Sequence, residues 1–298
     1  MGWLFLFVVV IGIVFFLHKK LSFTYGLSPK SIETKPLKGL KKLSENLEQS
    51  LSKSYMKHVE ERVMKEKKLK ENEYNWRLLD LKRYFILTSL LKESPMFSNK
   101  VDDLWHEMLM FTREYDDFSK KYAGNILHHS PNVTKISDPD LRGFFDWVYA
   151  ELFLIRKENI HLYKGFFRHP VNPTIVEEFK TLSENELIDK YFKSDRHYLS
   201  TILSLISSMK KTANGVKDYE KRVVQEKMRK SKIQKNFNAM LVPFLSVSYF
   251  HYDDFSNYMK ISSVSSSSCT SCGSGSSSSC SSVSSCSSSC SSCGGGSD

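Results

Sequence analysis

Cysteine is absent from residues 1–268 of this 298-residue chain, and all six cysteines follow that stretch. Small secreted domains that rely on disulfides carry cysteines throughout the fold, so this distribution argues against a disulfide framework. It also leaves residues 1–268 without a cysteine nucleophile. Cysteine usage therefore fits a reducing compartment.

Other signatures of enzymes and nucleic-acid binders are also missing. The chain has no glycine-rich phosphate loop, no GxSxG elbow and no HExxH pair. It has a formal net charge of +10 but neither an aromatic RNP pattern nor a zinc finger in its body. These absences favour a protein that is not an enzyme and does not bind nucleic acid, and they leave open an enzyme that uses a metal ion. Its charge suits an anionic membrane face.

No side-chain cation precedes the one long apolar run, WLFLFVVVIGIVFFL at residues 3–17. With its flanking residues this run spans roughly 25–30 Å as a helix, enough for a bilayer core. Lysines follow it at once, at Lys19 and Lys20 and on through residue 42. Because positive charge stays on the cytoplasmic side, we expect a single-pass anchor at residues 1–20 in the cell membrane, with the N-terminus outside and the body cytoplasmic.

A cleaved signal peptide is the alternative for the same run. A signal peptide has a basic n-region and a small-x-small cleavage site. Only Met1 and Gly2 precede the run, and the bulky residues Phe15, Phe16 and Leu17 end it. The sequence therefore favours an uncleaved anchor.

Charge and proline divide the segment after the anchor into two parts. Residues 21–43 predict a basic juxtamembrane linker, broken by Pro29 and Pro36. Residues 44–75 predict a charged helix. Its apolar stripe repeats every four residues, at Leu43, Leu47, Leu51, Tyr55, Val59 and Val63. Such a narrow stripe is typical of a helix on the surface or facing a partner.

Residues 76–260 predict a helical domain, because apolar residues recur with helical spacing and no strand series or internal repeat is present. Residues 76–91 are strongly apolar and should be buried. Ser98 is a candidate N-cap for a helix that continues to Gly124. Asp138 and Pro139 are typical of the start of another helix, over residues 138–163.

Further signals mark the second half of this domain. Ser183 and Glu186 have the spacing of a capping box, which predicts a helix starting at Glu184. The chain remains apolar over residues 187–209, and Gly215 should end that helical region. Residues 216–240 predict a strongly basic helix that could contact anionic lipid or an acidic partner, or could simply be solvated. Residues 241–259 fit a final helix or a short extended segment.

Residues 261–298 consist largely of serine, cysteine and glycine and predict a disordered tail, because they cannot bury enough apolar surface to offset their ordering entropy. Two CxxC pairs in this tail have the spacing of a four-cysteine zinc site: Cys269, Cys272, Cys290 and Cys293. Serine-rich tracts produce such pairs easily, and only Val283 between them could contribute to a core. A disordered tail is favoured over a zinc site.

A cluster of histidines and aspartates lies between residues 102 and 129. Asp102 and His106 are one helical turn apart, so they share a helix face at the edge of the apolar stripe. Gly124 allows the chain to return His128 and His129 toward that face. Histidine with aspartate suits zinc, iron or manganese. The alternative is a polar seam, in which Asp102 holds a boundary histidine and His128 or His129 caps helix carbonyls.

The same stretch resembles the glycine-rich domain-containing-protein-like family. The matching residues are Val101-Asp102-Asp103-Leu104-Trp105-His106, Tyr115-Asp116-Asp117-Phe118, Gly124 and His128-His129-Ser130-Pro131. The resemblance is strong over residues 98–131 and looser over 76–165. Ser119 departs from the pattern, because the family often has cysteine there. The resemblance implies a helical domain without an assigned activity, and a polar centre at Asp102, Trp105, His106, His128 and His129.

Two functions follow as expectations. The first is a membrane-anchored interaction or scaffold module at the cytoplasmic membrane face, which contacts anionic lipid through its basic segments and binds a further protein. The second is a metal-binding protein or metal-dependent enzyme that uses Asp102, His106, His128 and His129. No cofactor is assured by the sequence, and the candidate is a divalent metal such as zinc.

Overall fold

The protein is mainly α-helical, as the sequence predicts. The computed structural model describes residue 3 and residues 23–129, 139–194, 197–234 and 236–261. Over these residues the chain forms helices, and the β-pairing consists of two isolated bridges, Thr34 to Phe153 and Leu91 to Phe192. Apart from Trp3, the anchor predicted at residues 1–20 lies outside the described residues. So does the tail predicted at 261–298, with its four candidate zinc ligands, apart from Ile261.

None of the described helices is both long and apolar enough to cross a membrane. In chain order the helices are α2 (Leu40–Ser50), α3 (Lys53–Lys67), α4 (Glu71–Leu90), α5 (Asn99–Leu109), α6 (Thr112–Ala123), α7 (Pro139–Leu152), α8 (Lys157–Leu162), α9 (Pro173–Thr181), α10 (Glu184–Tyr191), α11 (Leu199–Asn214), α12 (Lys221–Ile233), η1 (Phe237–Met240, a 3₁₀ turn), α13 (Leu241–Phe250) and α14 (Phe255–Tyr258).

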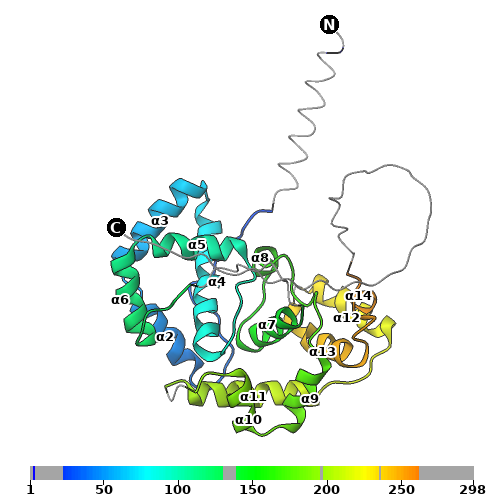
Figure 1. Ribbon diagram of the computed structural model, residues 1–298. Coiled ribbons are helices and arrows are strands. Elements are labelled where there is room, and N and C mark those ends of the chain that lie inside the picture. Colours follow the sequence, from blue (N-terminus) through cyan, green and yellow to red (C-terminus); the bar gives the residue numbers. More distant parts are fainter. Residues whose placement is uncertain (1–2, 4–22, 130–138, 195–196, 235, 262–298) are drawn as a thin grey trace, which may run out of the picture. The chain divides into compact units, whose positions relative to one another are not determined.

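Helix α4 is the centre of the N-terminal half. It is buried on nearly all sides, because α2, α3, α5 and α8 pack against it (Figure 1). Among its apolar side chains, Trp76, Leu81 and Phe85 each expose 1% or less. Burial on every side explains why this helix carries no single apolar stripe. Helix α5, which holds the candidate site, is therefore fixed against the best-packed element of this half.

The charged helix expected at residues 44–75 is instead two helices and the start of a third. Helix α2 ends at Ser50, and Ser52 caps α3 by accepting a hydrogen bond from the Tyr55 amide. The whole predicted stripe from Leu43 to Val63 is buried in the core, so it faces the protein's own helices and not a partner, while the charged faces of α2 and α3 lie on the surface. The stripe is narrow because each helix buries one face, α2 against α4 and α6, and α3 against α4 and α5.

The segment expected to be a juxtamembrane linker packs onto the helices over its described part, residues 23–39. Its carbonyls accept hydrogen bonds from buried side chains: Gly26 from the Trp76 indole at 2.9 Å, and Ile32 from the Arg83 guanidinium at 3.0 Å. The Lys35 amide also donates to the Leu152 carbonyl. We call residues 23–39 the strap. Its proline and lysine residues are typical of a linker, but its backbone carbonyls and the buried side chains of Tyr25 and Ile32 join it to the core.

Two of the expected long helices are interrupted. The helix expected from Ser98 to Gly124 breaks at Met110 and Phe111, which gives α5 and α6. The helix expected over 138–163 breaks after Leu152, where Phe153 pairs with Thr34 of the strap. In both cases the apolar spacing continues across the break, because the second helix packs against the same core. Spacing alone therefore could not reveal either turn.

The expected helix boundaries agree with the structure at several caps. The Ser98 hydroxyl accepts from the Val101 amide, and Gly124 ends α6 in a left-handed conformation. Ser183 and Glu186 form the capping box that starts α10, and Gly215 ends α11. Helix α7 begins at Pro139, while Asp138, its expected cap, lies outside the described residues. Local capping chemistry identifies these boundaries independently of packing.

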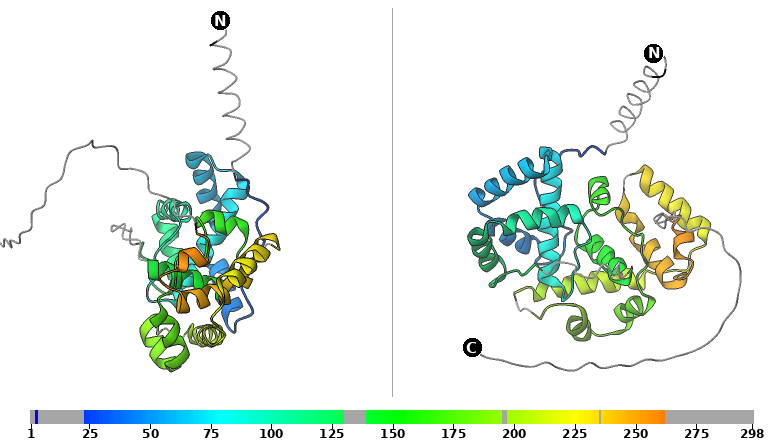
Figure 2. Two further views of the ribbon diagram at one scale, coloured as in Figure 1. Left: turned by 90° about the vertical axis from the view of Figure 1, so that its right-hand side faces the viewer. Right: turned by 45° about the horizontal axis from the view of Figure 1, so that its top comes forward.

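The second half is built around α11, against which α7, α9, α10 and α13 pack (Figure 2). The basic helix expected over 216–240 is shorter, because only Lys221–Ile233 is α-helical and η1 follows. Helix α12 packs against η1 and α14 and keeps much of its surface exposed.

Candidate metal centre

The site begins with two side chains that project from the same face of α5. Asp102 and His106 are four residues apart, and His106 Nδ1 lies 3.7 Å from Asp102 Oδ2. Their side chains are 29% and 49% exposed, respectively, which places the pair at the edge of the core. This spacing on one helix is a common way to present two ligands to one ion.

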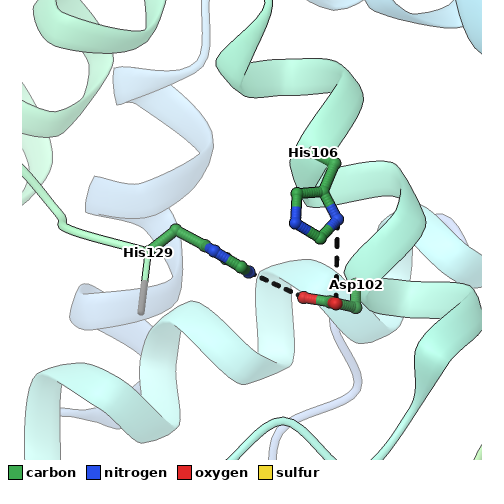
Figure 3. A group of neighbouring side chains, drawn as sticks. All are labelled: Asp102, His106 and His129. Atoms are coloured by element: carbon green, nitrogen blue, oxygen red, sulfur yellow. Dashed lines mark hydrogen bonds and ion pairs between the residues drawn. The ribbon is translucent and has the colours of Figure 1, made fainter. Parts of the chain in front are cut away.

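The third side chain comes from the segment after α6. His129 Nε2 lies 2.8 Å from Asp102 Oδ1, and only 8% of the His129 side chain is exposed. Figure 3 shows both imidazoles converging on the two oxygens of this one carboxylate. The His106 and His129 rings are 4.5 Å apart between centroids. The expected return of the chain toward α5 therefore occurs, and His129 is the residue that arrives.

A chain of hydrogen bonds holds the returning segment in place. The Trp105 indole donates to the Tyr115 hydroxyl at 3.0 Å, and that hydroxyl donates to the Leu127 carbonyl at 2.6 Å. We call these three groups the tyrosine clasp. Burial raises the pKa of Tyr115, so the hydroxyl keeps the proton that it donates. Because Leu127 is two residues before His129, the clasp fixes where that histidine lies.

Gly124 makes the return possible. Its φ is 73°, which lies in the left-handed region that strains most other residues. In this conformation it ends α6 and turns the chain. Nothing lies within 4 Å of the position that a Cβ would occupy. Glycine is therefore required here by backbone conformation and not by lack of space.

The three side chains lie close enough to share one metal ion. One possible ligand atom each from Asp102, His106 and His129 lies within 4.8 Å of the others. Metal–nitrogen and metal–oxygen bonds of about 2.0–2.1 Å place tetrahedral ligands roughly 3.3 Å apart. The contacts of 2.8 and 3.7 Å are made to different oxygens of Asp102. Atoms as much as 4.8 Å apart would therefore have to approach each other by up to about 1.5 Å to bind one ion.

Neighbouring carboxylates on α5 are engaged elsewhere. Glu107 accepts a hydrogen bond from Arg62 at 2.7 Å, and Asp103 lies within 4 Å of Lys67 and Arg77. These pairs point the other acids of α5 toward cations of α3 and α4. Asp102 is left as the carboxylate that both histidines share.

His128 does not join the group, although the sequence suggests it as a ligand. Its side chain is exposed, and it lines a cleft of about 580 Å³ beside the site. Trp105, His129, Tyr84 and Phe85 also line this cleft. Adjacent residues in an extended segment point to opposite sides, so only one of the two histidines can face Asp102. Ser119, where the resembling family often has cysteine, is fully buried in α6 and is not a ligand.

A second polar cluster was not anticipated from the sequence. Asp80 and Arg83, both on α4, expose none of their surface and meet at the Tyr149 hydroxyl, which donates to Asp80 and accepts from Arg83 at 2.8 Å. The Asn159 amide also donates to Asp80, at 2.8 Å. Burial raises the pKa of Asp80. The available signal was the presence of charged residues, Asp80 and Arg83 among them, within a strongly apolar run. Their hydrogen bonds join α4, α7 and α8.

The candidate metal centre lies within the part of the chain that matches a known family model. A family model described as UCP032817-like, an uncharacterised family, matches residues 45–145. This span contains Asp102, His106, Gly124 and His129. The glycine-rich domain-containing-protein-like family is not the one that this match names. No curated protein and no solved structure matched the chain.

Proposed function

We propose that the helical body is a metal-binding module that holds a divalent first-row ion, with Zn²⁺ as the first candidate, at Asp102, His106 and His129. The observation that carries the proposal is the convergence of both histidines on one carboxylate from two separate segments. Two imidazoles and one carboxylate suit zinc, iron and manganese.

The surroundings of the site support this proposal. The Trp105 ring meets His129 edge-on, with centroids 4.5 Å apart, and the tyrosine clasp limits how far the returning segment can move. Such support around the ligands lowers the cost of assembling a metal site. The half-exposed His106 gives an ion a route from solvent.

Three protein ligands would leave a coordination position open. Structural zinc sites are closed by four protein ligands, whereas catalytic ones keep a place for water or substrate. A metal-dependent enzyme is therefore the form of this function that the ligand number favours. A water bound to Zn²⁺ there would have a pKa near 7, low enough to supply hydroxide.

Elemental analysis of the purified full chain tests the proposal. All six tail cysteines are first replaced by serine, so that thiols contribute no metal. We expect about one ion per chain after supplementation with Zn²⁺, and its loss in His106→Ala and His129→Ala. Affinity should fall by more than the roughly 10–100-fold typical of an outer-shell change.

His128→Ala is the matched control, because it removes an adjacent histidine that does not face Asp102. It should retain the ion. If no variant differs from the parent, or if supplemented protein binds no metal, the proposal is wrong and the Asp102–His129 pair only fastens the returning segment.

An interaction or scaffold role at the cytoplasmic membrane face is the second candidate function. Its supporting observation is the exposed cationic surface of α12, away from the metal centre in sequence. Cross-linking of the full chain in membranes, followed by mass spectrometry, should recover a partner cross-linked to this helix. Recovery of the same cross-links from a variant with neutralised α12 cations would count against this role.

A further inference from the structure

We infer that the outer face of α12, together with Lys260, is a docking surface for anionic membrane lipid. The inference refines the second candidate function and does not depend on a metal ion. It rests on a groove of about 500 Å³ whose lining includes four cations and one acid. The cations are Arg222, Arg229, Lys232 and Lys260, and the acid is Glu226.

The acid in this groove is already neutralised. Glu226 accepts two hydrogen bonds from Arg229, at 3.0 and 2.8 Å, and lies 3.4 Å from Lys230. Two other cations of α12 are near aromatic rings: Lys221 lies over Tyr258 and Lys227 over Tyr219.

Three cations of the groove have no such neighbour. Among the described residues, no ion pair or ring contact engages the side chains of Arg222, Lys232 or Lys260. Their charge faces solvent from one connected surface. This surface can therefore attract an external anion without first breaking an internal pair.

Apolar side chains are exposed on the same helix. Ile233 is 66% exposed and Val223 is 39% exposed. Arg222, Arg229 and Ile233 follow one another at spacings of seven and four residues, so they share the face opposite the buried Val224 and Ser231.

This mixture of cations and exposed aliphatic groups determines which anion fits. A helix that lies on a bilayer places lysine and arginine among headgroups and aliphatic side chains at the acyl boundary. A phosphate or an acidic protein segment would use the cations but would leave Ile233 in water. Charge and apolar exposure together therefore favour an anionic lipid surface.

Hydrogen exchange of the full chain in lipid nanodiscs tests this inference, because the readout is local to α12. Discs of phosphatidylcholine alone are compared with discs that also contain phosphatidylserine. We expect slower exchange at residues 221–233 only in the anionic discs, and loss of that difference at high salt.

The triple variant Arg222→Gln, Lys232→Gln, Lys260→Gln should abolish the protection. Each cation near an anionic surface contributes about 1 kcal/mol, or roughly a fivefold change in the ratio of docked to undocked helix. Loss of three should lower that ratio roughly 100-fold. The matched control neutralises Lys53, Lys57 and Lys65 of α3 and should keep the protection, as should the variant Arg222→Lys, Lys232→Arg, Lys260→Arg.

Equal exchange in neutral and anionic discs would overturn the inference. So would equal protection by soluble glycerophosphoserine, which would indicate a small-anion site, or protection by an acidic peptide but not by anionic discs. None of these outcomes would alter the metal content of the protein, so failure here is distinguishable from failure of the metal proposal.

Discussion

His129 Nε2 lies 2.8 Å from Asp102 Oδ1, although 27 residues separate them in the chain. The pair joins the first turn of α5 to the segment beyond α6, and His106 approaches the other oxygen of the same carboxylate. Asp102 thus contacts two histidines from separate parts of the chain, one on α5 and one in the segment after α6.

The tyrosine clasp should be necessary for the position of His129. Tyr115→Phe removes the hydroxyl between Trp105 and Leu127, which leaves a buried indole donor unpaired. We expect the free energy of unfolding to fall by about 1–3 kcal/mol, and amides near Leu127 to exchange faster. Urea unfolding and hydrogen exchange measure the two effects.

Tyr122→Phe is the control for this change. It removes a buried hydroxyl from the same helix, where it bonds to Ser89 at 2.9 Å and not to the returning segment. It should cost stability without faster exchange at Leu127. Similar exchange in both variants would show that the clasp has no local role.

Gly124→Ala should destabilise the protein by about 1–2 kcal/mol, because the backbone at this position is left-handed and a Cβ strains it. The space around the residue is open, so steric overlap adds nothing. Gly124→Asn should cost less, since asparagine tolerates this conformation better. Thermal unfolding of both variants checks the order, and an equal loss would contradict the conformational explanation.

Arg83→Met should be among the most damaging substitutions in α4. It removes the buried cation that donates to the Tyr149 hydroxyl, which itself donates to Asp80, and the loss of one member of a buried charged network costs about 3–5 kcal/mol. Lys57→Met, which breaks an exposed pair with Glu61 on α3, should cost less than about 0.5 kcal/mol. Chemical denaturation compares them, and comparable losses would refute a special role for the buried network.

Stability should depend on pH through Asp146. This side chain is fully buried, and burial raises its pKa from 3.8 to about 6, although Arg142 and the Phe167 amide hydrogen-bond to it. Because the folded pKa is above the unfolded one, the folded state binds the proton more tightly. The resulting stabilisation is fully present below about pH 3.8 and is lost as pH rises to about 6.

The loss over this window amounts to about 3 kcal/mol. Asp146→Asn cannot titrate, so the difference in unfolding free energy between the parent and this variant should change by most of that amount, about 2 kcal/mol, between pH 4 and pH 7. Urea denaturation at the two pH values isolates the effect from other groups. A constant difference would show that Asp146 is not responsible.

The sequence indicates the caps and the main residues of the candidate site but not the breaks between helices. Ser98, Gly124 and Ser183 act locally, so their roles follow from their neighbours in the chain. The turn at Phe111 lies within continuous apolar spacing and is decided by how α5 and α6 pack. That His129 and not His128 faces Asp102 depends on the tyrosine clasp. The clasp joins Trp105, Tyr115 and Leu127, whose spacing in the sequence does not predict their contact. The union of Asp80 and Arg83 with Tyr149 likewise requires the folded structure.

The strap has a practical consequence for where a working fragment can begin. Trp76 and Arg83 lie within the family match at residues 45–145, yet their hydrogen bonds are accepted by Gly26 and Ile32, and Arg83 also donates to the Leu154 carbonyl. A truncation to the matched span would remove these acceptor carbonyls on both sides of it and leave the buried donors of Trp76 and Arg83 without partners. The smallest unit expected to fold therefore starts near residue 23 and extends well past residue 154.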